Sequence, residues 1–369
     1  MAQLAVGVIG AARGLSLAQI FDALPETRVV AIADRIEARL KAALAELPGA
    51  EGFSDADDLL RRAPDVVVVA SSPPQHAAHV RAALEAGAAV LSEVPAADTL
   101  DGAQRIVDAV TRTGGFYMLG ENCNYYGFIL AWKQLLRTGV LGEIVHAEGE
   151  YVHDIRSITH MDSAGRTMTL EEARRTPDAR PTWRAGYHPI LYITHSLGPL
   201  LWLIEDRCTS ASCLASGTRT APEVGSPDAE VATFSTTRGV PIRQLCAFSV
   251  PREPGGQWYS LYTTTGCVEW RRCGWDSGRM YLAGKGMTDF ERMPWTVAPP
   301  DVGLPDSGHG GIDGALVKDF VRALVTGAPS PIDVHAAMDT SLPGIFARMS
   351  AERGGERLRI PDTRTERLA

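Results

Sequence analysis

The sequence predicts an α/β protein of two domains: an N-terminal doubly wound Rossmann domain and a C-terminal α+β domain with an open, mostly antiparallel sheet. A chain of 369 residues is longer than one hydrophobic core ordinarily organises. Strand and helix patterns alternate through the first third, which is typical of a parallel sheet, whereas strands with few helices dominate later. We therefore expect the first domain at residues 1–123 and the second at residues 124–369.

The composition is that of a globular protein, with 45% hydrophobic and 22% charged residues. A formal net charge of −8 argues against nucleic acid and against an anionic membrane surface as partners. The chain contains no uninterrupted apolar run of roughly 18 residues, so we expect no membrane span. Its N-terminus enters a strand pattern without a basic, cleavable leader, and we expect a cytoplasmic protein.

The six cysteines carry no metal-binding pattern. They form no C-x-x-C pair and do not combine with histidine at zinc-finger spacing. Reduced thiols in a cytoplasmic enzyme are the simplest account, and the sequence predicts no metal site.

The first segment has the order of a dinucleotide-binding unit. A buried strand at residues 4–9 leads into a glycine turn at residues 10–14, and a helix follows at residues 15–24. A second strand at residues 29–33 ends at Asp34. The turn lets a pyrophosphate reach the N-terminus of the helix, and the acid accepts from the ribose hydroxyls.

The glycine pattern of this unit is incomplete, because Ala12 stands where a second glycine is usual. The spacing from Gly14 to Asp34 nevertheless fits the fingerprint. A carboxylate at position 34 repels a 2′-phosphate and favours NAD, while the neighbouring Arg35 keeps NADP open. The predicted cofactor contacts here are Gly10, Ala12, Arg13, Gly14, Asp34 and Arg35.

The Rossmann pattern continues with a strand at residues 65–70, whose carboxyl end opens into a loop at residues 71–76. Ligands of open α/β sheets bind at such ends. A helix at residues 77–86, a strand at 89–91, a helix at 99–113 and a strand at 116–119 complete the sheet. His76 either contacts the cofactor or caps its loop. Further predicted cofactor contacts are Ser71, Pro73, His76, Glu93 and Asn122.

In the second domain we expect a helix at residues 128–138 and a strand at 143–153. Four later strands are expected at residues 230–236, 242–248, 258–264 and 267–271, and two amphipathic helices, at 313–326 and 334–353, return to the first domain. One sheet face would lie over the nicotinamide and the other would be free for subunit contact, which favours a homodimer or homotetramer.

Tyr192 and His195 are the strongest catalytic candidates from spacing alone. They lie three positions apart at the start of an apolar run, so a helix turn would place a phenol and an imidazole on one face. The alternative is a buried tyrosine beside a hydrogen-bonded core histidine.

The segment at residues 153–184 is rich in arginine and acidic residues. It is either a solvated, salt-bridged loop or a lid that offers guanidinium groups to an anionic sugar. His309, in a glycine-rich stretch, either faces the site or lies in a turn.

Residues 71–97 resemble the Gfo/Idh/MocA oxidoreductases; they read SSPPQHAAHVRAALEAGAAVLSEVPAA. Members of that family carry Glu-Lys-Pro, whereas Val94 stands here in place of the usual catalytic lysine. Glu-Val-Pro-Ala-Ala at 93–97 and Glu-Asn-Cys-Asn-Tyr at 121–125 resemble one branch, the NAD-dependent α-N-acetylgalactosaminidases of glycoside hydrolase family 109 and relatives such as NAD-dependent sulfoquinovosidases. The likeness continues through stretches at 139–154, 183–184, 192–199 and 308–317.

The resemblance implies a small glycoside as substrate and NAD as cofactor. The sugar's C3 hydroxyl would be oxidised, its C2 proton and C1 leaving group eliminated, water added and the hydride returned. By resemblance, Tyr192, His195 and Glu121 are catalytic. The predicted substrate contacts are Tyr151, His153, Arg156, Arg184 and His309. An NAD(P)-dependent sugar or polyol dehydrogenase is the main alternative, against which Val94 argues, and a non-catalytic sugar or dinucleotide sensor is the third.

Overall fold

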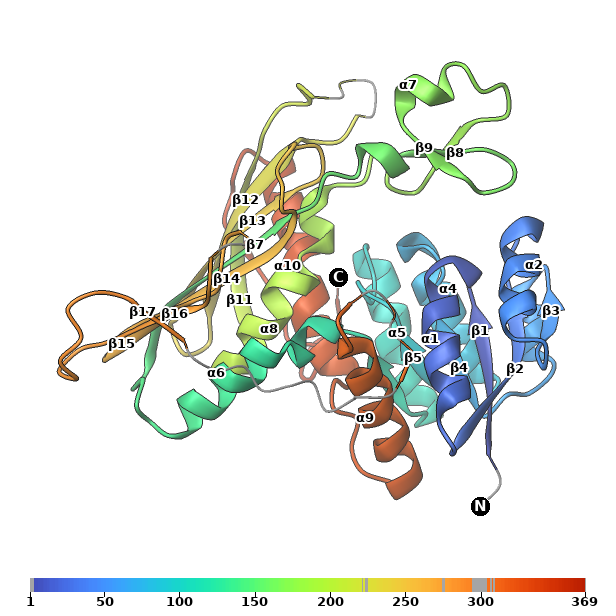
Figure 1. Cartoon of the computed structure of the whole chain (residues 1–369), viewed down its shortest axis with the longest axis horizontal. Helices are drawn as coiled ribbons and strands as arrows, with labels where there is room; N and C mark the ends of the chain where they lie inside the picture. The colour runs from blue at the N-terminus through green and yellow to red at the C-terminus, as the bar shows by residue number, and fades with distance from the viewer. Residues whose placement is uncertain are drawn as a thin grey trace.

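The computed structural model describes residues 3–220, 222, 225–273, 276–293, 304–305, 307 and 309–368. Two sheets organise this part of the chain, one of six strands and one of nine. Figure 1 shows the six-stranded sheet with its helices at the right, the nine-stranded sheet at the left, and helices between them. The predicted fold class, a Rossmann domain followed by a domain with a mostly antiparallel sheet, is confirmed.

The first sheet is parallel throughout and has the strand order β3-β2-β1-β4-β5-β6. Its strands are β1 (Leu4–Ile9), β2 (Thr27–Ala33), β3 (Glu51–Phe53), β4 (Val66–Val69), β5 (Ala89–Ser92) and β6 (Tyr117–Leu119). Its helices are α1 (Ala11–Ala23), α2 (Glu37–Glu46), α3 (Ala56–Leu60), α4 (Pro73–Glu85) and α5 (Leu100–Thr113). The chain reverses its direction of travel between β1 and β4, so a crevice lies at the carboxyl ends of these central strands.

Two predicted loops of this domain are shorter than expected. Helix α1 begins at Ala11 rather than at residue 15. The Asp34 carboxylate accepts from the Ala11 amide at 2.8 Å, and of the two glycines in this turn Gly10 has a positive φ, of 99°, whereas Gly14 is already helical. Helix α4 begins at Pro73, whose fixed φ suits a first helical turn. His76 is therefore a helical residue and not part of a loop.

The second sheet has the strand order β17-β16-β15-β14-β7-β13-β12-β11-β18. Its strands are β7 (Ile144–Val152), β11 (Cys208–Ala215), β12 (Ala229–Thr236), β13 (Pro241–Ala247), β14 (Gly256–Thr263), β15 (Gly266–Glu269), β16 (Arg279–Leu282), β17 (Glu291–Arg292) and β18 (Leu358–Arg359). Among the strands that the structure describes in this sheet, β7 and β13 are the only parallel pair. Strand β11 was not predicted from the sequence, because it has serine and cysteine in place of branched residues. The short strands β16 to β18 were not predicted either.

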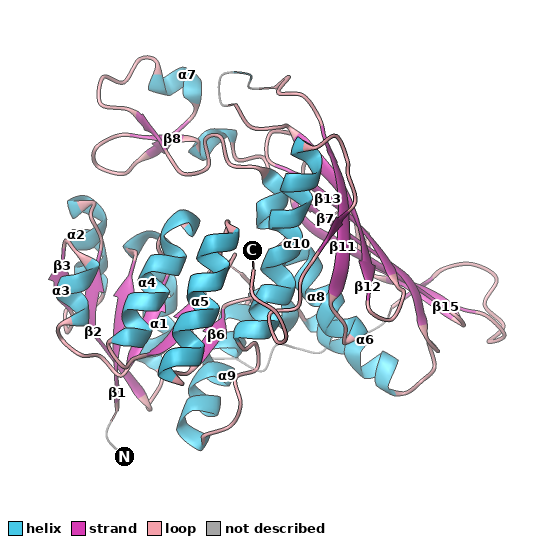
Figure 2. Cartoon of the chain, turned by 180° about the vertical axis from the view of Figure 1, so that it is seen from behind, coloured by secondary structure: helices cyan, strands magenta, loops and turns pink. Residues whose placement is uncertain are grey.

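Four helices fill the space between the two sheets and around their edges, as Figure 2 shows from behind. They are α6 (Gly127–Arg137), α8 (Thr194–Ile204), α9 (Ile312–Thr326) and α10 (Val334–Glu352). Helix α9 packs on α1, and α10 packs on α5 and β6 as well as on β11. The boundary at residue 123 stays a prediction. Within the described residues, no helix has both the length and the apolar character that a membrane crossing requires.

The segment at 153–184 forms a small layer of its own, seen at the top of Figure 1. It contains η2 (Arg156–Ile158), β8 (His160–Met161), β9 (Thr167–Met168), α7 (Leu170–Ala173) and β10 (Arg180–Pro181), with the strand order β10-β8-β9. Three of its arginines pair within the segment: Arg156 with Asp154, Arg166 with Asp162 and Arg175 with Glu171. Its tip contacts the first domain, where Arg39 of α2 donates to the Gly165 carbonyl at 2.9 Å. The segment is therefore salt-bridged internally and also reaches across to the Rossmann domain.

Candidate active site

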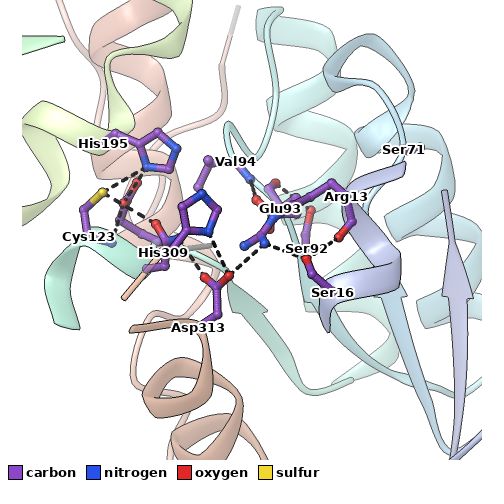
Figure 3. Close-up of polar contacts among 12 residues, drawn as sticks. Arg13, Ser16, Ser71, Ser92, Glu93, Val94, Cys123, His195, His309 and Asp313 are labelled. Atoms are coloured by element: carbon purple, nitrogen blue, oxygen red, sulfur yellow. Dashed lines mark hydrogen bonds and ion pairs between the residues drawn. The ribbon is translucent and has the colours of Figure 1, made fainter. Parts of the chain in front are cut away.

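The core of the site is a buried acid–imidazole pair. Glu121 follows β6 and leads into η1 (Asn122–Tyr125), while His195 lies in the first turn of α8. His195 Nδ1 lies 2.9 Å from Glu121 Oε1 and 3.4 Å from Cys123 Sγ, as Figure 3 shows for the labelled Cys123 and His195. Burial lowers the pKa of the imidazole, but the Glu121 carboxylate and Cys123 raise it more, so the pKa of His195 is well above its ordinary value.

One backbone hydrogen bond of helix α8 is missing, the one that the carbonyl of His195 would accept. Pro199, four residues later, has no N–H to give to the His195 carbonyl. The Tyr259 hydroxyl of β14 donates to that carbonyl instead, at 2.5 Å. Gly198 gives room to the acid, since a Cβ there would lie 3.0 Å from Glu121 Cγ. Glu121 thus contacts the imidazole ring of His195, and Tyr259 binds the backbone carbonyl of the same residue.

Aromatic rings line the approach to this pair. Tyr192 ends η3 (Pro189–Tyr192), one residue before α8, and its ring centroid lies 5.4 Å from that of His195. The Tyr151 ring of β7 lies 5.7 Å from His195 and 5.8 Å from Tyr192. Burial raises the pKa of both phenols. Within the described part of the chain, His195 Nε2 and the Tyr192 hydroxyl have no hydrogen-bond partner, so both are available to a ligand.

Of the predicted substrate contacts on the segment at 153–184, two reach this cluster. Arg184 lies over the Trp183 ring at 4.2 Å, and Trp183 stacks near Tyr192 with centroids 5.9 Å apart. Burial lowers the pKa of the Arg184 guanidinium. His153 Nδ1 lies 3.1 Å from the Tyr151 hydroxyl. Arg156 is not brought to the cluster: its guanidinium donates twice to Asp154, at 2.8 and 2.6 Å.

The turn after β1 has the shape that a dinucleotide requires. A Cβ on Gly10 would lie 2.4 Å from the Ala70 carbonyl oxygen, and one on Gly14 would lie 2.6 Å from Val8 Cγ1. Both positions therefore need glycine. Ala12 and Arg13 occupy the first turn of α1, whose amides lack intrahelical acceptors and suit a pyrophosphate. The residues present fit NAD.

Asp34 also fits a bound dinucleotide, although its carboxylate already accepts hydrogen bonds from the backbone. Its oxygens accept from the amides of Ala11 and Ile36, both at 2.8 Å. A carboxylate has about four acceptor positions, so capacity remains for ribose hydroxyls. Arg35 beside it is exposed.

Both ring nitrogens of His76 contact backbone carbonyl groups, so neither is left free for a ligand. His76 is 1% exposed, and its ring nitrogens lie 2.8 Å from the carbonyls of Pro95 and Ser71. Of the two roles left open for His76, capping is the one this geometry supports. Ser71 lies at the crevice with its hydroxyl 2.9 Å from His79 Nδ1, and the buried Pro73 starts α4.

A second polar network lies opposite the Glu121–His195 pair, centred on Asp313 at the start of α9. Figure 3 shows Arg13, Glu93, His309 and Asp313 facing His195. Arg13 donates to Glu93 at 2.8 Å and to Asp313 at 2.7 Å. Asn122 Nδ2 donates to Asp313 at 2.7 Å, and His309 Nδ1 lies 2.9 Å from it.

This network joins Arg13, in the first turn of α1, to Glu93, which follows β5, and Asn122, which follows β6. Burial alone would raise the pKa of Asp313, but hydrogen bonds from His309 and Arg13 hold it far below its usual range. The sequence analysis missed Asp313 as a site residue. An acid in the first turn of a helix, directly after a glycine-rich stretch that holds His309, was the available signal.

Glu121, Cys123 and His195 also form a group that could offer three ligand atoms to a metal ion, all within 4.8 Å of one another. Burial raises the pKa of the Cys123 thiol to about 11, which opposes thiolate ligation at neutral pH. That no metal is used stays a prediction. All six cysteines are free.

The fold and the glycine cradle define a protein with an NAD-binding Rossmann domain. Residues 4–121 match the family model described as the oxidoreductase family, NAD-binding Rossmann fold, known as Gfo/Idh/MocA. Residues 125–221 match the model of the glycosyl hydrolase 109 C-terminal domain. The chain therefore joins a Gfo/Idh/MocA domain to a glycosyl hydrolase 109 segment, and the resemblance inferred from its motifs is confirmed.

Individual relatives agree with these domain matches. A glycosyl hydrolase family 109 protein of Saccharopolyspora erythraea is 26% identical, over 97% of this chain and 82% of its own. An alpha-N-acetylgalactosaminidase of Tannerella forsythia is 24% identical, over 81% of this chain and 70% of its own. Among solved structures, levoglucosan dehydrogenase in complex with NADH and L-sorbose shares the fold with a TM-score of 0.78 at 17% identity, over 98% of this chain and all of the other.

Proposed function

We propose that this protein is a cytoplasmic NAD-dependent glycoside hydrolase that is redox-neutral over each turnover. The observation that carries the proposal is the buried Glu121–His195 pair with Tyr192 beside it, at a site where the lysine typical of Gfo/Idh/MocA dehydrogenases is replaced by Val94. Val94 is 1% exposed and apolar, so it has no proton to exchange. The glycosyl hydrolase 109 match and the names of the relatives support the same function.

The residues that would hold NAD are those of the crevice. Gly10, Ala12 and Arg13 would receive the pyrophosphate and Asp34 the adenosine ribose. When bound, NAD supplies a reversible hydride acceptor for the sugar's C3 hydroxyl, which makes the neighbouring C2 proton acidic.

Tyr192 and His195 would handle the C3 hydroxyl proton and the C2 proton. Because Glu121 occupies Nδ1, His195 exchanges protons with a substrate only through Nε2. Both protons are removed from the sugar, so His195 would accept a proton on Nε2; the Glu121 carboxylate favours the imidazolium that results, which can then give the proton to the departing C1 oxygen. Loss of the C2 proton expels the C1 group, and water then adds to the unsaturated ketone.

Arg184 supports an anionic substrate. Its guanidinium is largely shielded from solvent, lies on Trp183, and has no carboxylate partner in the described part of the chain. Arginine binds carboxylate and sulfonate groups through two parallel hydrogen bonds. Sulfoquinovosides and uronides therefore rank first as substrates; α-N-acetylgalactosaminides are retained because one relative is named for that activity.

A panel of neutral, N-acetylated and anionic nitrophenyl glycosides, assayed with and without added NAD, tests the proposal. We expect NAD-dependent release of nitrophenol without net NADH. Stoichiometric NADH with no aglycone release would contradict it and identify an NAD(P)-dependent sugar or polyol dehydrogenase. Cofactor binding without any turnover would favour a sensor. Unchanged exchange of the C2 proton for deuterium in both Tyr192→Phe and His195→Gln would remove the proposed proton roles.

We also propose that the outer face of the nine-stranded sheet joins copies of the chain into a dimer or tetramer. Leu214 of β11 and Val231 of β12 are register partners on that face and are 65% and 40% exposed, and Tyr262 of β14 is 42% exposed. Light scattering should show a dimer or tetramer that Leu214→Glu dissociates. A monomer at every concentration would contradict this.

A further inference from the structure

Two helices beside the site carry a glycine next to a proline in their interiors. Helix α8 contains Gly198 and Pro199, and α10 contains Pro343 and Gly344. Both residue types destabilise the interior of a helix relative to alanine. Glu121 packs against Gly198, which accounts for the first glycine. The second glycine has a neighbour of a different kind, the backbone of η3.

Gly344 allows α10 to lie close to this turn. A Cβ at position 344 would lie 2.7 Å from the carbonyl oxygen of Ile190 and 3.3 Å from the Cα atom of Leu191, both in η3. These neighbours are backbone atoms of a regular turn, so they cannot move aside as the end of a flexible side chain can. The distance between α10 and η3 therefore requires glycine at position 344.

The amide of Ile190 is held from the nine-stranded sheet. Glu230 of β12 is fully buried, and its Oε2 accepts from the Ile190 amide at 2.9 Å. Its Oε1 lies 3.0 Å from Nδ1 of His188, the residue that precedes η3. Because Pro189 has no N–H, the Ile190 amide is the first backbone donor of η3, and Glu230 satisfies it.

Glu230 and Gly344 thus contact the two peptide groups that flank one residue, Ile190. Tyr192 follows two residues later and ends the same turn, so the position of Ile190 sets that of the tyrosine ring. A buried carboxylate costs free energy unless it is hydrogen-bonded, and a proline next to a glycine weakens a helix. Three locally unfavourable choices therefore meet at η3, which is typical of a functional site.

Helix α10 also contacts the cofactor crevice. The amide of Ala96, in the stretch at 93–97 that follows β5, donates to Ser341 Oγ at 3.1 Å. Ser341 and Gly344 lie three residues apart on α10, so they share one face of the helix. One rigid element therefore contacts both the crevice loop and the turn that carries Tyr192.

We propose that Glu230 and Gly344 are positioning residues that fix the Tyr192 hydroxyl relative to the cofactor crevice. Glu230 holds η3 against the sheet, and Gly344 sets the distance from η3 to α10. Glu230 is fully buried and Gly344 has no side chain, so both act through Tyr192. The role of Tyr192 in proton transfer rests on the proposed function, whereas the position of its ring does not.

Fluorine NMR of the NAD-loaded protein labelled with 3-fluorotyrosine tests the position of the ring. The resonance of Tyr192 is the one that Tyr192→Phe removes. We expect Glu230→Ala and Gly344→Ala to shift or split it. Glu230→Gln should leave it unchanged, because the amide oxygen still accepts from Ile190 and the amide N–H can donate to His188 Nδ1.

Asp228→Ala is the matched control. Asp228 lies two residues before Glu230, is 8% exposed, and accepts from the amides of Arg219, at 2.8 Å, and Thr220, at 3.1 Å, both outside η3. It should leave the Tyr192 resonance in place. An unchanged resonance in Glu230→Ala and Gly344→Ala would overturn the proposal. An equal shift in Asp228→Ala or in Glu230→Gln would do the same.

Circular dichroism checks that each variant folds, and Gly344→Ala decides the outcome if Glu230→Ala does not. Steady-state kinetics with the glycoside that the panel identifies give a second readout. Both variants should lower kcat, by up to about a hundredfold for a displacement of about 1 Å, with little change in KM.

In the Tyr192→Phe background, Glu230→Ala and Gly344→Ala should lower kcat no further, because they act through the phenol. A full additional loss in that background would contradict the proposal. The NMR measurement needs no turnover, so failure of this proposal is distinct from failure of the proposed function.

Discussion

The carbonyl oxygen of His195 accepts a hydrogen bond from the hydroxyl of Tyr259 at 2.5 Å. In an uninterrupted helix that oxygen would accept from the amide four residues later, but the residue there is Pro199. This hydrogen bond thereby links helix α8 to strand β14 at the backbone of His195. The same oxygen could be satisfied in either of two ways, and this makes the contribution of Tyr259 measurable.

We expect Tyr259→Phe to lower the free energy of unfolding by about 1–3 kcal/mol, because it leaves a buried carbonyl without a donor. Pro199→Ala supplies a backbone N–H four residues from His195. In the Tyr259→Phe background it should therefore recover part of the loss, while alone it should have a small effect. Urea denaturation of the four proteins measures this cycle. Additive effects of the two substitutions would show that the carbonyl does not link them.

Glu121→Gln should lower the pKa of His195, because it removes the carboxylate that raises it. A histidine whose pKa is raised in the folded state adds stability that is fully present below its unfolded pKa, near 6.5, and lost as the pH rises through the folded value. The free-energy difference between wild type and Glu121→Gln should thus be largest below about pH 6.5 and shrink at alkaline pH.

NMR titration of the His195 imidazole measures the pKa directly, and urea denaturation from pH 6 to pH 9 measures the stability difference. Glu205→Gln is the matched control, because that acid pairs with Lys133 and not with His195. A stability difference that stays constant across this range would show that His195 does not titrate against Glu121.

Local patterns were sufficient to predict most of the Rossmann domain. The four valines of β4 are all fully buried, as a continuous apolar run in a central parallel strand predicts. Tyr192 and His195 were found from their spacing, although they lie on η3 and α8 and not on one helix. A 3-10 turn that leads directly into an α-helix keeps side chains three residues apart on nearly the same face.

What the sequence could not show depends on distant pairings. Tyr259 contacts a residue 64 positions away, and Asn122 contacts Asp313 191 positions away, so no local period marks either. The sequence showed that Arg156 is charged, but it did not show that Arg156 forms an ion pair with Asp154. The helix starts at Ala11 and Pro73 were missed because a glycine and a proline, which often mark loops, here stand at helix N-termini.

Asp313→Asn should destabilise the protein and weaken NAD binding together. Its carboxylate receives bonds from Arg13, Asn122 and His309, so the substitution leaves the Arg13 charge with Glu93 alone. We expect a loss of about 2–3 kcal/mol, less than for a fully buried pair because a quarter of the Arg13 side chain is exposed.

Thermal melting with and without NAD measures both effects. Arg322→Ala, on the exposed side of the same helix α9, should leave the melting temperature and its rise with NAD nearly unchanged. A normal rise with NAD in Asp313→Asn would show that the network is structural and does not reach the cofactor.

The contact between Arg39 and Gly165 should control access to the crevice. Arg39 lies on α2, which begins shortly after Asp34, and its guanidinium donates to the Gly165 carbonyl at 2.9 Å. Gly165 has a φ of +81°, and a Cβ there would lie 2.7 Å from Arg39 Nε. Both Arg39→Ala and Gly165→Ala should therefore release the tip of the segment at 153–184. We expect trypsin to cleave this arginine-rich segment about fivefold faster, the factor that a hydrogen bond of about 1 kcal/mol represents.

The same release should speed the dissociation of NAD, because the tip lies beside the residues that would receive the adenosine ribose. Displacement of bound NAD by excess NADH, followed by fluorescence, measures that rate. Lys41→Ala is the control on α2, since Lys41 pairs with Glu37 and both side chains are exposed. If Arg39→Ala and Lys41→Ala give the same cleavage and dissociation rates, the segment is not held closed by this contact. If cleavage alone accelerates, the segment moves without covering the cofactor.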